Sequence, residues 1–339
     1  MNAPQQSFLV TCVGAYDDSG LGTGGFVCLG ESGAVTIDKI DSTGLCAHGE
    51  VVYRFARGLR SIIGYGSEGV RSFLRVPEAK DIHDLFVIGD EFVAVSTGSN
   101  EVVWLDFHGT VRRRWQAEGE HDAWHLNCLW PDSGRLYLCA FGRFPTHRGW
   151  LGQCGETGIV FDIESGREVV TGLSGPHNPR LIDGHWVVCD SHVSALIVQA
   201  PDGTRRSVAL GGFTRGLAFD AHYYYVGVSA NRKAVVPETE SHIAVVDRTA
   251  LEVVARHAIP FPEIYDLIPI APTHAARIAG NVSAFQLDLT ADHTRTLERQ
   301  IELGLDEIVS LQLQLAEARE QKGLRGALGE VKRALTGTR

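Results

Sequence analysis

The sequence has no long apolar run and no pair of cysteines at metal-binding spacing. Its first ten residues lack the basic stretch and apolar segment of a secretory signal, and no later segment is long and apolar enough to be a transmembrane helix. We therefore expect a cytoplasmic protein without a membrane partner. The seven cysteines are odd in number and never spaced Cys-x-x-Cys, which argues against a disulfide framework and a zinc knuckle.

Basic surface and common catalytic motifs are also missing. The formal net charge is −10, and the most compact basic run, Arg112–Arg114, continues an apparent strand, so a nucleic-acid partner is not expected. The absence of Gly-x-Ser-x-Gly and His-Glu-x-x-His motifs argues against a serine hydrolase and a zinc protease. The glycine-rich segment at residues 21–26 lacks the Gly-Lys-Ser/Thr ending of a phosphate-binding loop and is interpreted as a hairpin.

Glycine and short β-rich runs are abundant instead. The chain has 38 glycines, and from Phe8 to about Pro272 short runs of strand-forming residues alternate with Gly, Asp and Ser turns. One unit of four such runs occupies residues 81–115. Comparable units recur at residues 42–76, 123–170, 176–210 and 213–259. Four strands joined by tight turns are typical of one blade of a β-propeller.

The last run, Ile264–Pro272, has no outer strands after it. Three unassigned runs within residues 8–40 supply the missing partners, because pairing them with the last run closes the ring and removes an exposed sheet edge. We therefore predict an all-β fold, a six-bladed β-propeller over residues 1–275. Five or seven blades are the alternatives, since the first repeats match the others poorly.

A helical pattern replaces the β pattern near the C-terminus. Leu297, Ile301, Ile308, Leu311 and Leu315 are spaced by three, four or seven residues, with charged residues between them. This pattern predicts a coiled coil within a helical extension, residues 276–339, that joins copies of the chain into a homo-oligomer. A helix that lies along the β-domain is the alternative.

Three histidines recur in the aligned repeats. His83, His125 and His177 come from successive units, and the same alignment adds Arg215 and Asp266 from later units. Because the innermost strand of each blade lines the axis of a propeller, these five side chains are expected to converge at one level of that axis.

Imidazoles gathered on one axis suit acid–base catalysis and metal binding. We predict that His83, His125, His177 and Asp266 are catalytic residues and ligands of a divalent metal ion (zinc, manganese or iron), with Glu263 as an alternative oxygen ligand. The alternative is that each histidine only hydrogen-bonds the strand backbone. Polar and aromatic residues of the same phrases are predicted to bind the substrate: Asn127, Asn178, Arg180, Arg215, Arg232 and Tyr265.

Several phrases together resemble a bacterial family known only as a domain of unknown function. They are WHLN from Trp124, HNPR from His177, GFTRGL from Gly212 and EIYD from Glu263, and the resemblance covers residues 80–270. More distantly, the chain resembles six-bladed propellers that include gluconolactonases and streptogramin lyases. That resemblance implies an axial site with a metal ion or a general base, and it favours a sugar-like substrate.

The sequence leads to one functional hypothesis and two alternatives. The hypothesis is an enzyme, a lyase, isomerase or hydrolase, that acts on a small polar or sugar-like metabolite whose anionic group is oriented by Arg180 and Arg215. The first alternative is a module that binds a small ligand without chemistry. The second is a scaffold propeller that binds other proteins.

Overall fold

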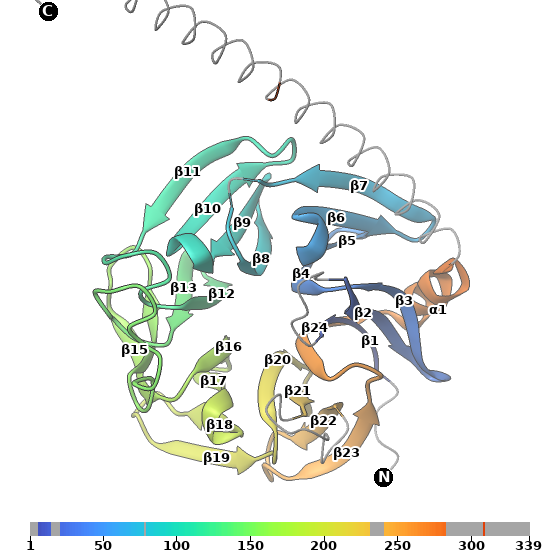
Figure 1. Ribbon diagram of the computed structural model, residues 1–339. Coiled ribbons are helices and arrows are strands. Elements are labelled where there is room, and N and C mark those ends of the chain that lie inside the picture. Colours follow the sequence, from blue (N-terminus) through green and yellow to red (C-terminus); the bar gives the residue numbers. More distant parts are fainter. Residues whose placement is uncertain (1–5, 15–20, 78, 231–240, 283–307, 309–339) are drawn as a thin grey trace, which may run out of the picture. The chain divides into compact units, whose positions relative to one another are not determined.

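Six four-stranded antiparallel sheets are arranged around one axis, which Figure 1 views end-on. This computed structural model describes residues 6–14, 21–77, 79–230, 241–282 and 308. In each sheet the strands pair in order from an inner strand to an outer strand. The predicted all-β, six-bladed propeller is therefore confirmed.

The blades follow one another along the chain, and the last one uses both ends of the propeller. Within each blade the strands are ordered from the inner to the outer one. The first two blades are β4 (Ser42–His48), β5 (Val51–Ala56), β6 (Ser61–Gly66) and β7 (Gly69–Arg75), then β8 (Ile82–Ile88), β9 (Glu91–Ser96), β10 (Glu101–Asp106) and β11 (Val111–Gln116); the third and fourth are β12 (Leu126–Asp132), β13 (Arg135–Ala140), β14 (Gly158–Asp162) and β15 (Glu168–Leu173), then β16 (Pro176–Ile182), β17 (His185–Asp190), β18 (Ala195–Gln199) and β19 (Arg205–Ala209). The fifth blade is β20 (Phe213–Phe219), β21 (Tyr223–Ser229), β22 (His242–Asp247) and β23 (Val253–Ala258), and the closing blade is β24 (Glu263–Ile270), β1 (Ser7–Val13), β2 (Leu21–Gly30) and β3 (Gly33–Ile40).

The ring closes through the sheet that joins the last strand to the first three. β24 pairs antiparallel with β1, so that Val10 lies opposite Leu267 and Thr11 lies opposite Asp266. β2 and β3 extend this sheet outward. β24 thereby gains the partners that the sequence after it does not supply, and the predicted closure is confirmed.

Two-residue turns between inner and second strands explain the tight repeat. In two blades these turns are Ser133–Gly134 and Asp183–Gly184, with φ values of 49° and 78° in the first and 50° and 77° in the second. Two left-handed residues form a type I′ turn, whose twist matches that of the flanking strands. Glycine at the second position adopts this conformation without the steric cost of a Cβ atom.

Apolar side chains between neighbouring blades form the core. One cluster joins Trp104 of β10 to Leu126, Leu138 and Phe161 of the next blade, and each of these side chains is at most 5% exposed. Similar clusters join four other pairs of adjacent blades. Burial of one such side chain contributes about 1.5–3 kcal/mol, so contacts between blades, rather than within one blade, hold the ring together.

One helix follows the propeller in the described part of the chain, α1 (Pro272–Gly280), which contacts β1 and β2 through its buried Ala275 and Ile278. It is not long and apolar enough to span a membrane. The predicted coiled-coil seam lies outside the described residues except for Ile308, which is helical and 52% exposed. Self-association through this segment therefore stays a prediction.

Candidate functional site

The inner strands bring their first residues together near one end of the axis. The second residue of the strand is His83 in β8, Asn127 in β12 and His177 in β16. His83 Nδ1 lies 3.0 Å from Asn127 Oδ1, so these two equivalent positions meet. The ring of His125 meets the ring of His83 edge-on, with 5.1 Å between their centres.

The other predicted residues occupy different positions along their strands. His125 precedes β12, Arg215 is the third residue of β20 and Asp266 is the fourth residue of β24. All six inner strands also shift register near their start, for example between Leu126 and Leu129 in β12. Such a bulge adds a residue to one strand and redirects its side chains.

His125 is held in one orientation by its neighbours. Its Nδ1 lies 2.8 Å from Asp122 Oδ1, and its ring centre lies 4.3 Å from those of Phe141 and Trp150. Because a carboxylate only accepts hydrogen bonds, Nδ1 carries the hydrogen and Nε2 carries the lone pair. Burial lowers the pKa of His125 to about 4, despite the opposing hydrogen bond to Asp122, so the ring is neutral at pH 7.

Arg215 and Tyr265 form a buried stacked pair beside His83. Arg215 Cζ lies 3.3 Å from the centre of the Tyr265 ring, which meets the His83 ring edge-on at 5.7 Å. Arg215 Nη1 lies 3.7 Å from Glu263 Oε1. Arg215 Nε and Nη2 and Tyr265 Oη are buried without a hydrogen-bond partner in the described part of the chain. Buried polar groups are nearly always paired, so these three atoms stand out among the described side chains near the axis.

Asn178 and Asp266 connect inner strands of different blades. Asn178 Nδ2 donates to Asp266 Oδ1 at 3.1 Å, and Asn178 Oδ1 accepts from the backbone N–H of Gly216 at 2.7 Å. Asp266 Oδ1 also accepts from the backbone N–H of Leu267. Both side chains are at most 3% exposed, so the structure gives these two predicted site residues a role in holding the ring together.

His177 and Arg180, the other predicted residues of β16, are buried among protein partners. His177 Nδ1 lies 2.7 Å from Ser191 Oγ, and burial, followed by the charge of Arg215, lowers the pKa of His177 well below its ordinary value. Arg180 Cζ lies 4.8 Å from the centre of the Trp130 ring, and its Nη1 donates to the carbonyl of Pro179. The predicted Arg232 lies outside the described residues.

Burial also controls the proton on Asp266. It raises the pKa of Asp266 from its ordinary value of 3.8 to about 6. Asp84, whose carboxylate accepts the backbone N–H groups of Leu85 and Leu129, has its pKa raised by burial and by the nearby Cys128 and Asp266. The two carboxyl groups thus oppose each other's ionisation.

Replacing Asp266 with Asn is expected to stabilise the protein near pH 8 but not near pH 4. The folded state holds the Asp266 proton more tightly than the unfolded chain, so stability falls as pH rises from 3.8 through about 6. An asparagine oxygen still accepts from Asn178 but does not ionise. The difference in the free energy of unfolding, variant minus wild type, should therefore increase by about 1–3 kcal/mol from pH 4 to pH 8. Urea unfolding measures this difference, and a difference that does not change with pH would contradict the raised pKa.

The predicted metal ligands do not fit a shared ion. His83 faces an acceptor at each ring nitrogen, because Nδ1 meets Asn127 Oδ1 and Nε2 lies 3.3 Å from Asp81 Oδ2. Asp266 Oδ1 already accepts from Asn178. Within residues 6–14, 21–77, 79–230, 241–282 and 308, no group of three or more His, Cys, Asp or Glu side chains is placed to hold a metal ion.

The sequence alignment missed the residues that surround His125. Asp122 precedes it by three residues, and this Asp-x-x-His spacing in the phrase HDAWHLN is a local signal that was available. Phe141 and Trp150 come from the end of β13 and the insertion after it. Their contact with His125 depends on how that insertion folds back, which no local pattern indicates.

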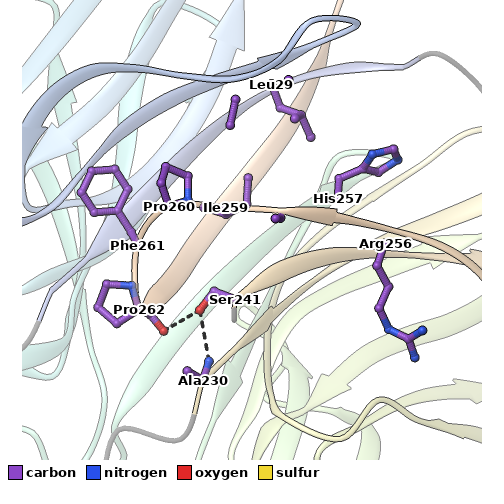
Figure 2. A pocket seen from close by; sticks show the side chains of 12 residues that line it. Leu29, Ala230, Ser241, Arg256, His257, Ile259, Pro260, Phe261 and Pro262 are labelled. Atoms are coloured by element: carbon purple, nitrogen blue, oxygen red, sulfur yellow. Dashed lines mark hydrogen bonds between the residues drawn. The ribbon is translucent and has the colours of Figure 1, made fainter. Parts of the chain in front are cut away.

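A separate groove of about 920 Å³ lies between the blade of β20–β23 and the closing blade (Figure 2). Its walls are mainly apolar, and Ser241 Oγ accepts from the N–H of Ala230 and donates to the carbonyl of Pro262. None of the predicted site residues that the structure describes lines this groove.

Fold and site together define a six-bladed β-propeller with a buried polar cluster at one end of its axis. The chain belongs to the family described as Domain of unknown function (DUF4915), which matches residues 73–278. The resemblance inferred from the sequence phrases is therefore confirmed. No curated protein is significantly similar in sequence to this chain.

Solved structures with the same fold include three bacterial proteins. A protein of unknown function from Bacteroides caccae is 12% identical, with 79% of this chain and 99% of that chain covered and a TM-score of 0.56. A calcium-binding regucalcin from Agrobacterium tumefaciens is 14% identical, with 69% and 79% covered and a TM-score of 0.52. A putative 6-phosphogluconolactonase from Bacteroides fragilis is 12% identical, with 79% and 98% covered and a TM-score of 0.52. At these identities the similarity shows the fold alone.

The solved structures that match also include a putative gluconolactonase, with a TM-score of 0.48, and a streptogramin B lyase, with a TM-score of 0.44. Because one fold serves many functions, the function of this chain has to be argued from its own site.

Proposed function

We propose that the chain is an enzyme that binds a small polar, sugar-like carboxylate at the axial cluster and uses His125 as its general base. The observation that carries the proposal is the buried, unpaired edge of Arg215. Its Nε and Nη2 have no partner in the described residues, and neither does the adjacent Tyr265 Oη. An unpaired buried donor costs about 1–3 kcal/mol, and a ligand that accepts from these atoms removes that cost.

The free edge of Arg215 matches a carboxylate in shape. Nε–H and the neighbouring Nη2–H point the same way from a planar guanidinium, so they can donate two parallel hydrogen bonds to two oxygens of one group. Nη1, on the other side, is beside Glu263. Stacking on Tyr265 holds the guanidinium plane in place, which lowers the entropy lost on binding.

The charges around the cluster favour an anion with a single negative charge. Arg215 is beside Glu263, and Asp81 lies 2.9 Å from Arg57. The neutral His125 adds no positive charge at pH 7. A dianionic phosphoryl group would bring a second negative charge into a cluster that already holds the carboxylates of Glu263 and Asp81, which is costly.

His125 supplies the reactive group. Its Nε2 lone pair can take a proton from a carbon or hydroxyl group of the ligand, or from a water molecule, and Asp122 stabilises the imidazolium that forms. Proton removal of this kind begins lyase, isomerase and hydrolase reactions. The metal ion expected from the sequence is not part of the proposal, because two of the four predicted ligands, His83 and Asp266, already have protein partners at their donor atoms.

Gluconate is a suitable first probe, since it combines one carboxylate with several hydroxyl groups. Calorimetric titration should show binding to the wild type, and Arg215→Gln should weaken it by roughly a hundredfold or more, because two charge-assisted hydrogen bonds are lost. Arg215→Lys keeps the charge but not the paired donors, and it should also bind weakly. Arg206→Gln, at an exposed arginine of β19, is the matched control and should bind as the wild type does.

Equal affinity in the wild type and Arg215→Gln would overturn the carboxylate site. For catalysis, His125→Asn retains a donor to Asp122 but loses Nε2, so turnover in a screen of sugar acids and their lactones should fall roughly 100-fold or more while binding persists. Binding that depends on Arg215, without any turnover in the wild type, would instead identify a ligand-binding module.

A further inference from the structure

The insertion between β13 and β14, residues 143–157, is held to the propeller by hydrogen bonds at its surface rather than by buried side chains. Its partners include Glu120, Asp122 and Glu168. It contains no helix or strand, and none of its residues is buried. Segments with little buried surface open at low free-energy cost compared with core strands, so this insertion is expected to open more readily than the strands around it.

The insertion is anchored on the same residue that orients His125. Arg148 Nε lies 3.0 Å from Asp122 Oδ2, and Trp150 Nε1 donates to the Asp122 carbonyl at 3.0 Å. The other carboxylate oxygen, Asp122 Oδ1, meets His125 Nδ1 at 2.8 Å. Although burial raises the pKa of Asp122, the hydrogen bonds from His125 and Arg148 lower it overall, so the carboxylate is charged and only accepts.

The same insertion covers one side of the axial cluster. The Trp150 ring packs on His125 and on Phe141, and Phe141 also meets the ring of His177 at 5.7 Å. Near the far end of the insertion, Cys154 Sγ lies 3.3 Å from His192 Nδ1 in the next blade. The insertion thus spans two blades and covers the ring of His125.

We infer that residues 143–157 are a lid, and that Arg148 and Trp150 are positioning residues that fix the ring of His125 when the lid is docked. Undocking frees Asp122 and uncovers the His125 ring, which opens a path to the cluster. Docking restores the Nδ1–H form of His125, with Nε2 free to act as the base, and excludes water from the bound ligand. The catalytic meaning of this lid rests on the proposed function, but its effect on His125 does not.

The tautomer of His125 tests the positioning role without any ligand. Nitrogen-15 chemical shifts distinguish the Nδ1–H tautomer of His125 from the Nε2–H tautomer. In the wild type the ratio of Nδ1–H to Nε2–H should be roughly ten or more, because only the Nδ1–H tautomer donates a hydrogen bond to the Asp122 carboxylate. Arg148→Gln combined with Trp150→Phe removes both side-chain anchors on Asp122 but keeps an aromatic cover. The ratio of the two forms should then fall at least about threefold.

Arg135→Gln is the matched control for this measurement. Arg135 lies on β13 outside the insertion and pairs with Asp162 at 3.2 Å on the surface, so its loss should leave the tautomer ratio unchanged. The single variants Arg148→Gln and Trp150→Phe separate the two anchors. An unchanged ratio in the double variant, with its melting temperature retained, would overturn the positioning role.

Hydrogen exchange with gluconate as the probe tests the lid. Amides of residues 143–157 should exchange rapidly in the free protein and at least about tenfold more slowly with gluconate bound, whereas core strands should not change. Bound gluconate with unchanged exchange would overturn the lid and leave the proposed function intact. Failure of gluconate to bind would count against the proposed function and would leave the tautomer result standing.

Discussion

Deleting residues 1–40 is expected to abolish folding of the propeller. The deletion removes β1, β2 and β3, three of the four strands of the sheet that closes the ring, and leaves β24 without its partner strand. It also removes buried side chains of the cluster between the closing blade and its neighbour, among them Phe8, Val10 and Val27. Each contributes about 1.5–3 kcal/mol, while a domain is stable by only about 5–15 kcal/mol in total.

Circular dichroism and thermal unfolding measure this outcome. The shortened chain should be insoluble, or should melt without a cooperative transition. A chain that lacks only residues 1–5, which precede β1, is the control and should melt like the wild type. A cooperative transition at the wild-type temperature after deletion of residues 1–40 would show that closure by β1–β3 is dispensable.

The repeat and its closure were predictable because both depend on local patterns. Turn residues such as Gly134 and Gly184 recur between short β-rich runs, and each run has the length of one strand. The closure was predictable because the inner strand at Ile264–Pro272 had no outer strands after it, while three strands near the N-terminus belonged to no other repeat. These signals survive in the sequence because every blade repeats them.

The position of each site residue within its strand was not predictable in the same way. His125 and His177 align in sequence, but Asn127, not His125, occupies the second position of its strand, as His83 and His177 do, and each inner strand shifts register by one residue near its start. A bulge depends on packing against the neighbouring blade, which the repeat alone does not record.

The unpaired edge of Arg215 illustrates a second limit. The sequence identified Arg215 as a candidate ligand-binding residue from its place in the phrase GFTRGL. Its stacking on Tyr265 and its proximity to Glu263 arise between β20 and β24, which are neighbours only in the folded ring. Which of its nitrogens are left for a ligand is therefore a property of the structure.

A buried charge that the sequence analysis did not identify lies in the first blade. Arg54 of β5 is completely buried, and its guanidinium meets Asp38 Oδ2 at 2.5 Å and the Tyr65 hydroxyl at 2.9 Å and 2.6 Å. The ring of Phe26 lies 4.7 Å from Arg54 Cζ. An arginine inside the apolar run VVYRFA was the available signal, and here it indicates an ion pair between the first blade and β3 of the closing blade.

Replacing Arg54 with Met is expected to destabilise the protein by about 3–5 kcal/mol, because it leaves the buried Asp38 carboxylate without its cation. Adding Asp38→Leu to this variant removes the stranded charge and should recover part of the loss. Arg114→Met is the matched control: Arg114 pairs with Glu101 at 2.8 Å on the surface, where such a pair is worth about 0–1 kcal/mol. Urea unfolding midpoints give all three values. Similar losses of stability for Arg54→Met and Arg114→Met would show that the buried Arg54–Asp38 pair stabilises the contact between the two blades no more than a surface ion pair does.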